Sequence, residues 1–141
     1  MTDWLYSRIL GLSEVETIAI VGPGAKRDLY NLLKDDYKVT LYDYDVKYRD
    51  DDEVVCSDVV FDIELKEDLI INFACEKMFP LGSIYKSREQ ILVGESEHHN
   101  GDCNPIESCE TLIEQNNIKD VYDTTVFPRW RGKYYIVYGC N

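Results

Sequence analysis

A glycine turn and an acidic residue have the types and spacing that are typical of a nucleotide site. The turn contains Gly22 and Gly24, and Asp43 lies 21 residues after Gly22. Glycine lets the backbone approach a ligand closely, and an acid about 20 residues further on can bind ribose hydroxyls. The spacing therefore predicts a site for an adenosine-containing ligand. The alternative is a tight turn followed by a solvated acid.

Two basic residues follow the turn. Arg27 stands where the third glycine of the dinucleotide-binding pattern would be. We expect Lys26 and Arg27 to be exposed residues that favour solubility, because long basic side chains are rarely buried. The alternative is that they contact a ligand phosphate.

A second group of polar side chains follows the apolar run at 69–73. Asn72 could orient an amine by hydrogen bonding, and Glu76 could accept its proton. The alternative is that Asn72 closes a turn and Glu76 is exposed. Cys75 is expected to be a small core residue, because no neighbouring feature would lower the pKa of its thiol.

The elements around the first group form a strand–helix–strand unit. The β-branched run at 17–21 predicts a strand buried on both faces, followed by a helix over 26–34 and a strand over 38–42. Ligands of open α/β sheets bind beyond the carboxyl ends of strands. We expect Asn72 and Glu76 at that edge of the sheet.

The remaining apolar runs predict further strands and one helix. Pro105 is a good first helical residue, and the link between the last two runs is short enough for an antiparallel hairpin. The runs predicted as strands are 54–56 and 59–61 (one or both forming the third strand), 69–73, 90–94, 121–127 and 133–138.

These elements predict an α/β fold with a mostly parallel, Rossmann-like sheet of about seven strands and a C-terminal antiparallel hairpin. We expect one domain over residues 1–141, with an N-terminal helix over 1–13. The stretches between the second and fourth strands are too short for ordinary crossover helices. Reduced helical cover on one face is therefore expected, and such a face makes a homodimer or a protein partner plausible.

The charge of the chain disfavours one class of partner. The net charge is −12, from 27 acidic and 15 basic residues, which would repel phosphate backbones. No direct nucleic-acid binding is expected. Solubility explains such a charge, and a protein that imitates nucleic acid is the alternative. The acid run at 50–53 is expected to be a solvated loop.

The five cysteines are odd in number and irregular in spacing, which predicts reduced thiols in a cytoplasmic protein. No apolar run approaches the ~18 residues that cross a bilayer, so no membrane association is expected. His98 and His99, with Cys103 and Cys109, lack the spacing of a zinc site, so no metal is expected.

The strand order and terminal hairpin resemble the class I, Rossmann-like methyltransferases that use S-adenosylmethionine. The segment 69–78 is also similar to a signature in a small, poorly characterised group of methyltransferase-like proteins of phages and bacteria. That group has Asn-x-x-Cys-Glu after the fourth strand, a serine after the fifth and an asparagine before the last helix. The corresponding positions here are Asn72, Cys75, Glu76, Ser96, Asn104 and Ser108.

The resemblance implies a small transferase domain with S-adenosylmethionine, or a related adenosine ligand, as its cofactor. Gly22 and Gly24 would border the cofactor, Asp43 would hold its ribose, and Asp58 would contact the adenine amino group. Catalysis would fall to Asn72 and Glu76, facing the transfer site with Cys75. The alternatives are a non-catalytic interaction protein, for example a viral one, that retains the fold, and an NAD-type binding module.

Overall fold

The computed structural model describes all 141 residues and contains a seven-stranded sheet with the strand order β3-β2-β1-β4-β5-β7-β6. β1, β2 and β3 pair in parallel, whereas β7 pairs antiparallel with β5 and β6. The predicted α/β fold with a C-terminal hairpin is therefore confirmed. None of the helices has the length and apolar character that a membrane crossing requires.

The chain divides into two compact units, Met1–Ile70 (unit 1) and Ile71–Asn141 (unit 2), and β4 (Leu69–Asn72) contains the boundary. The other elements of unit 1 are α1 (Thr2–Leu10), β1 (Thr17–Val21), α2 (Asp28–Leu33), β2 (Lys38–Asp43), the 3-10 helix η1 (Val46–Tyr48) and β3 (Val54–Cys56). Those of unit 2 are α3 (Leu81–Ile84), β5 (Glu89–Glu95), α4 (Cys109–Asn116), β6 (Asp120–Pro128) and β7 (Lys133–Cys140).

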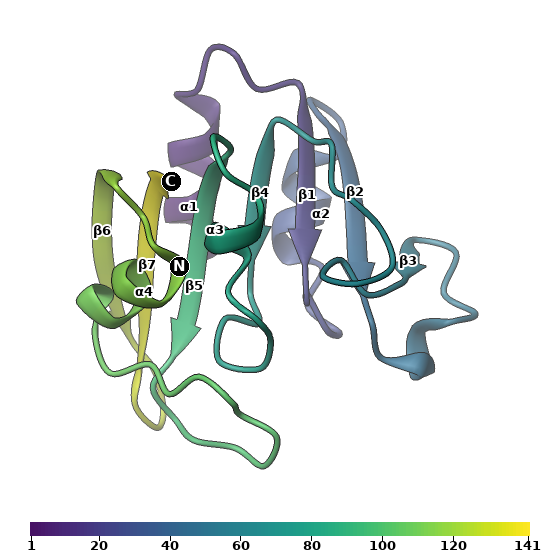
Figure 1. Cartoon of the computed structure of the whole chain (residues 1–141). Coiled ribbons are helices and arrows are strands. Elements are labelled where there is room, and N and C mark those ends of the chain that lie inside the picture. Colours follow the sequence, from purple (N-terminus) through teal and green to yellow (C-terminus); the bar gives the residue numbers. More distant parts are fainter. The chain divides into compact units, whose positions relative to one another are not determined.

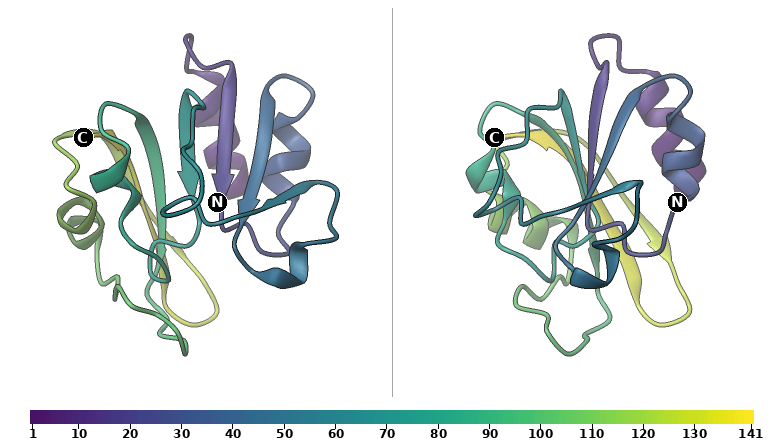
Figure 2. Two further views of the ribbon diagram at one scale, coloured as in Figure 1. Left: turned by 45° about the vertical axis from the view of Figure 1, so that its right-hand side comes forward. Right: turned by 90° about the vertical axis from the view of Figure 1, so that its right-hand side faces the viewer.

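β1 lies beside β2 in unit 1. Its residues Ile18 and Ile20 are almost fully buried, as expected for a parallel strand, and they pair in register with Val39 and Leu41 of β2. Both helices of this unit lie on one face of β1 and β2 (Figures 1 and 2). α1 and α2 contribute buried leucine and isoleucine side chains to the core, namely Leu5, Ile9, Leu29 and Leu33.

The opposite face of β1 and β2 carries a loop, residues 57–68, instead of a helix (Figure 1). This strand face is mixed, because the buried apolar residues Ala19 and Val21 of β1 pair in register with Thr40 and Tyr42 of β2. The Tyr42 hydroxyl donates a hydrogen bond to Glu67 Oε1 at 2.6 Å, and a cavity of about 150 Å³ is lined by Thr17, Lys38, Thr40, Lys66 and Glu67. Val59 and Leu65 of the loop are almost fully buried, so the β3–β4 connection contributes to the core although it contains no helix. The expected reduction in helical cover is confirmed.

Only one of the two apolar runs near residue 57 forms a strand. β3 covers Val54–Cys56, whereas the second run is a turn, because Asp58 Oδ1 accepts hydrogen bonds from Val60 N at 2.8 Å and Phe61 N at 3.3 Å. Side-chain bonds of this kind compete with sheet pairing. Phe61 is left 83% exposed.

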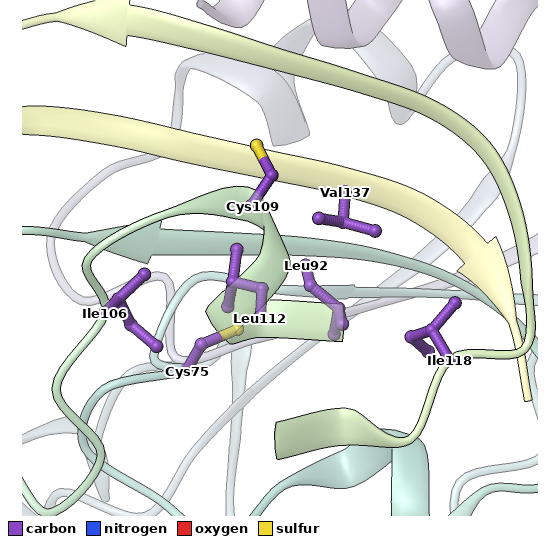
Figure 3. Close-up of a cluster of buried hydrophobic side chains, with 7 residues drawn as sticks. All are labelled: Cys75, Leu92, Ile106, Cys109, Leu112, Ile118 and Val137. Carbon is purple, nitrogen blue, oxygen red and sulfur yellow. The ribbon is translucent and has the colours of Figure 1, made fainter. Parts of the chain in front are cut away.

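In unit 2, α4 begins later than the sequence predicts. Pro105 is not its first residue, because the Ser108 hydroxyl accepts a hydrogen bond from Thr111 N at 3.1 Å and caps a helix that starts at Cys109. β6 and β7 form the expected hairpin, with a bulge in β6 between Val121 and Asp123. A buried cluster joins α4 to β5 and β7 (Figure 3); it comprises Cys75, Leu92, Ile106, Cys109, Leu112, Ile118 and Val137.

The short helix α3, which packs against the end of α4, has no signal among the apolar patterns of the sequence. Gly82 N donates a hydrogen bond to Asn116 Oδ1 at 3.1 Å, and both residues are buried. A Cβ at position 82 would lie 2.6 Å from the Asn116 Cβ and closer still to its carbonyl oxygen. Glycine is therefore required sterically at this contact.

We expect Gly82→Ala to lower the free energy of unfolding by about 1–3 kcal/mol, the usual cost of overpacking. The measurement is urea unfolding followed by circular dichroism. Gly11→Ala is the matched control, because a Cβ there would lie 3.3 Å from the Arg8 carbonyl oxygen and the backbone is already right-handed helical. Equal stability of the Gly82→Ala and Gly11→Ala proteins would contradict the packing described here.

Candidate functional site

The glycine turn follows β1 directly. Gly22 and Gly24 both have left-handed backbones, with φ of 63° and 57°. Only glycine adopts such angles without steric cost. Gly22 N donates a hydrogen bond to the Tyr42 carbonyl oxygen at 2.8 Å, which keeps the start of the turn against β2.

Asp43, at the end of β2, binds the other side of this turn through hydrogen bonds. Its Oδ2 accepts a hydrogen bond from Gly24 N at 3.2 Å and its Oδ1 accepts one from Asp45 N at 3.1 Å. Asp43 is only 8% exposed, so the alternative of a solvated acid is wrong. A carboxylate has about four acceptor positions, and these two bonds leave acceptor capacity on each oxygen.

Arg27 closes the turn from outside. Its Nη1 donates hydrogen bonds to the carbonyl oxygens of Gly24 and, at 3.4 Å, Lys26, while its Nη2 lies 3.0 Å from Asp51 Oδ2. The guanidinium carbon also lies 5.8 Å from the ring centre of Tyr48. The expectation of an exposed Arg27 is therefore wrong, although Lys26 is exposed. Asp51 is likewise not a freely solvated member of the acid run.

Asp58 follows β3 by two residues and is half-buried. Its Oδ1 is engaged by the turn at Val60 and Phe61. η1 packs near the same strand, since Cys56 Sγ lies 3.5 Å from the Asp45 carbonyl oxygen. The sequence did not indicate that the segment after Asp43 would fold back in this way.

The residues of the turn fit an adenosine ligand. The acceptor capacity of Asp43 suits a pair of ribose hydroxyls. The side of Gly24 that a Cβ would occupy is open, since Tyr48 Oη at 3.7 Å is the sole neighbouring atom within 4 Å. A ligand can therefore approach the backbone at Gly24, as it does at nucleotide-binding turns.

Asn72 ends β4 in unit 2. Its Oδ1 accepts a hydrogen bond from Ala74 N at 2.8 Å, so the side chain does close a turn. Asn72 is 1% exposed, and its Nδ2 is buried without a hydrogen-bond partner. Buried polar groups are seldom left unpaired. The Nδ2 amide is therefore the group of Asn72 that is left to donate a hydrogen bond to a ligand.

Glu76 is 2% exposed, so the alternative of an exposed Glu76 is wrong. Its Oε2 accepts a hydrogen bond from Glu95 N at 3.4 Å, and its carbonyl oxygen accepts bonds from Cys103 N and Asn104 N. Burial raises the pKa of the Glu76 carboxyl, and Lys77, 4.0 Å away, offsets this only in part.

Other positions of the resemblance have structural roles. Burial raises the pKa of the Cys75 thiol, which lies in the apolar cluster of Figure 3 and so is the expected core residue. Asn104 Nδ2 donates to the carbonyl oxygens of Cys75 and Met78, and Ser96 Oγ accepts from Lys133 N at 2.8 Å. These bonds fix the loop after β5.

One polar cluster was not found from the sequence. His99 Nε2 lies 3.0 Å from Glu95 Oε1, and the ligand atoms of Glu95, Glu97 and His99 lie within 4.8 Å of one another. Arg129 pairs with both glutamates, so the chain itself supplies a cation to this cluster. The three residues stand at every second position of the sequence, and this spacing is the signal that could have indicated the cluster. Cys109, considered earlier beside His99, lies instead in the apolar cluster.

We expect Glu76→Gln to raise the free energy of unfolding at pH 7. A carboxyl whose pKa is raised on folding stabilises the fold while protonated, and this contribution is lost as pH rises through the raised pKa. Glutamine stays neutral and can still accept the bond from Glu95 N. Urea unfolding at pH 7 and pH 4 should give a difference from wild type that shrinks at the lower pH. Glu107→Gln removes an exposed charge as the control, and a pH-independent effect of Glu76→Gln would refute this assignment.

The sequence matches no protein-family model, and no curated protein matches it. Solved structures do match. They include the 1,6-didemethyltoxoflavin-N1-methyltransferase of Burkholderia thailandensis with bound S-adenosylhomocysteine (TM-score 0.68, 16% identity, covering 99% of this chain and 76% of that one). The magnesium protoporphyrin IX methyltransferase of Synechocystis PCC 6803 with bound S-adenosylmethionine gives a TM-score of 0.61, with 10% identity over 99% of this chain and 77% of that one.

An S-adenosylmethionine-dependent methyltransferase from Archaeoglobus fulgidus has a TM-score of 0.63 and 12% identity, and the match covers 99% of this chain and 94% of that one. At these identities the likeness concerns the fold. The resemblance to class I methyltransferases is thus confirmed for the fold, while the narrower similarity to the phage and bacterial group stays a prediction. This chain has the Rossmann-like methyltransferase fold.

Proposed function

We propose that this chain is a methyltransferase-like domain that binds S-adenosylmethionine or a related adenosine ligand at the Gly22–Gly24 turn. The observation that carries the proposal is the contact between Asp43 and Gly24, which places a buried carboxylate against a turn of two left-handed glycines. The ligands named for proteins of the same fold agree with it.

In this proposal the turn and the strand ends share the recognition of the ligand. Asp43 accepts hydrogen bonds from the ribose hydroxyls through the acceptor positions that Gly24 N and Asp45 N leave open. Asp58 binds the adenine amino group through Oδ2, because its Oδ1 already holds the turn at Val60. Such bonds to charged groups contribute more than neutral ones.

The bound cofactor would supply an electrophilic methyl group. Residues of the protein would orient the molecule that accepts the methyl group and remove its proton. Glu76 receives the proton that the acceptor loses, since a raised pKa makes a carboxylate a better base at neutral pH. Asn72 orients the acceptor through its unpartnered Nδ2, which donates to an oxygen or nitrogen of that molecule. We propose a cytoplasmic enzyme with these roles.

Two alternatives differ in class. An NAD-type module would use the same turn and Asp43. It differs from the proposed function in its ligand, which would be NAD. A non-catalytic interaction protein is favoured by the exposure of two large apolar side chains, Trp130 at 93% and Phe61 at 83%. Exposed aromatic residues are typical of contact surfaces, and a homodimer is one such outcome.

Isothermal titration calorimetry tests the ligand. Wild-type protein should bind S-adenosylmethionine or S-adenosylhomocysteine more tightly than NAD. Asp43→Ala should weaken that binding by about 1–3 kcal/mol, or about five- to 150-fold, because the ribose hydroxyls lose a buried partner. Asp35→Ala, which removes an exposed acid just beyond α2, should leave the affinity unchanged. Absence of binding by wild-type protein at millimolar ligand would contradict the proposal. Tighter binding of NAD than of the S-adenosyl ligands would favour the NAD-type module.

Transfer of radiolabel from S-adenosylmethionine into host macromolecules and small molecules tests catalysis. Asn72→Asp keeps the acceptor for Ala74 N but removes the amide donor, and Glu76→Gln keeps the acceptor for Glu95 N but removes the base. Each should slow turnover by about 10²-fold or more with little change in cofactor affinity. Glu107→Gln should transfer label as wild type does. Unchanged labelling by both variants would mean that the active site lies elsewhere, and no transfer together with a stoichiometric captured protein would favour the interaction protein.

A further inference from the structure

We infer that a cavity at the amino ends of β1 and β2 binds a small tetrahedral oxyanion, of which inorganic phosphate is the simplest example. The cavity has a volume of about 150 Å³, and the residues that line it are Thr17, Lys38, Thr40, Lys66 and Glu67. All of them belong to unit 1. Thr17 begins β1 whereas Gly22 follows the other end of that strand, about 16 Å away at the usual rise per residue. The cavity is therefore separate from the glycine turn, and the inference does not depend on the proposed function.

The strand side of the cavity follows from the alternation of side chains along β2. Lys38 and Thr40 are two residues apart, so both side chains lie on the same face of the sheet. Thr17 of β1 pairs in register with Lys38 and lies on that face too. This is the face that the loop 57–68 covers in place of a helix (Figures 1 and 2). The sheet therefore places an ammonium group and a hydroxyl beside the end of this loop.

Hydrogen bonds hold the end of the loop against the strands. Asp68 Oδ2 accepts bonds from Glu16 N at 3.0 Å, from Thr17 N at 2.9 Å and from Thr17 Oγ1 at 2.9 Å. Glu67 Oε1 accepts the bond from the Tyr42 hydroxyl at 2.6 Å, and its Oε2 accepts one from the preceding backbone N–H at 3.0 Å. These bonds fix both carboxylates in the wall, so the cavity is formed before any ligand enters.

The lining of the cavity carries more positive than negative charge. Lys38 and Lys66 supply two ammonium groups, against the single carboxylate of Glu67. The ammonium group of Lys38 forms no ion pair or hydrogen bond, although the chain has 27 acidic residues and only 15 basic ones. The Thr40 hydroxyl is half-buried and has no hydrogen-bond partner in the protein. Both donors are thus available to an anion in the cavity.

Charge, donor direction and size together select the ligand. The two ammonium groups come from different elements, β2 and the loop, and together they match a doubly charged anion. A tetrahedral anion presents oxygens in several directions, whereas a planar carboxylate is best matched by the parallel donors of a guanidinium group. A cavity of this volume accommodates about six non-hydrogen atoms, which is sufficient for one phosphate ion.

Nuclear magnetic resonance of isotope-labelled protein tests the inference. Sodium phosphate is added near neutral pH, with sodium chloride used to keep the ionic strength constant. The backbone amide signals of Thr40, Lys66 and Glu67 should shift and reach saturation, whereas those of Gly22 and Gly24 should stay unchanged. Sodium acetate should bind at least about tenfold more weakly than phosphate, because a carboxylate offers fewer oxygens and less charge to the two lysines.

Two variants test the residues that contact the anion. Lys38→Met keeps the apolar stem and removes the ammonium group, so it should weaken phosphate binding by about fivefold or more. Thr40→Val removes the hydroxyl, keeps the branched shape and should weaken binding by about threefold. Lys34→Met is the matched control, because Lys34 is an exposed lysine just beyond α2, on the opposite face of the sheet, and its loss changes the net charge equally. It should bind phosphate as wild type does.

Acetate binding as tight as phosphate binding, or equal phosphate affinities of Lys38→Met and Lys34→Met, would overturn the inference. Phosphate shifts confined to the glycine turn would overturn it as well, and none of these results bears on the proposed function. If Thr40→Val does not fold, as judged by circular dichroism, the two lysine variants decide the matter, because both lysines are exposed. A further titration with glycerol 3-phosphate distinguishes the source of the oxyanion. Tighter binding than that of inorganic phosphate identifies a phosphate ester as the ligand, and equal or weaker binding identifies the free ion.

Discussion

The hydrogen bond between Gly24 N and the Asp43 carboxylate is the contact on which the glycine turn depends. A buried carboxylate is costly unless it is bonded, and here the backbone supplies both partners. The turn can meet Asp43 only because Gly22 and Gly24 adopt left-handed angles. The position of Arg27 follows in turn, since its guanidinium binds the carbonyl of the glycine that Asp43 has fixed.

Local patterns were sufficient to predict most of the sheet. β1, β2 and the hairpin of β6 and β7 appear where β-branched runs and short links place them. The errors came from side chains that compete for backbone N–H groups. Asp58 takes the run at 59–61 out of the sheet, and Ser108 rather than Pro105 starts α4. Apolar periodicity does not register such bonds, because they depend on the local orientation of one polar group.

The candidate site was predictable only in part, because its electrostatics depend on residues far apart in sequence. The spacing predicted that the glycine turn and Asp43 belong to one site, whereas the hydrogen bond between Gly24 and Asp43 and the ion pair from Arg27 to Asp51 were not predicted. The surroundings of Glu76 likewise depend on β5, whose Glu95 N donates to its side chain, and on the loop after β5, which donates to its carbonyl oxygen. A sequence pattern gives the identity of such a residue but not its exposure.

β6 is the last strand in the order of the sheet, and its irregularity hinders the addition of a further strand at this edge. An unpaired edge is a template on which another chain can form a further strand. The bulge between Val121 and Asp123 interrupts the regular row of hydrogen-bonding groups there, and Pro128 ends it with a residue that has no N–H to donate. Asp120 adds an exposed negative charge. The strand thereby resists edge-to-edge aggregation at high concentration, even though apolar side chains lie along its surface.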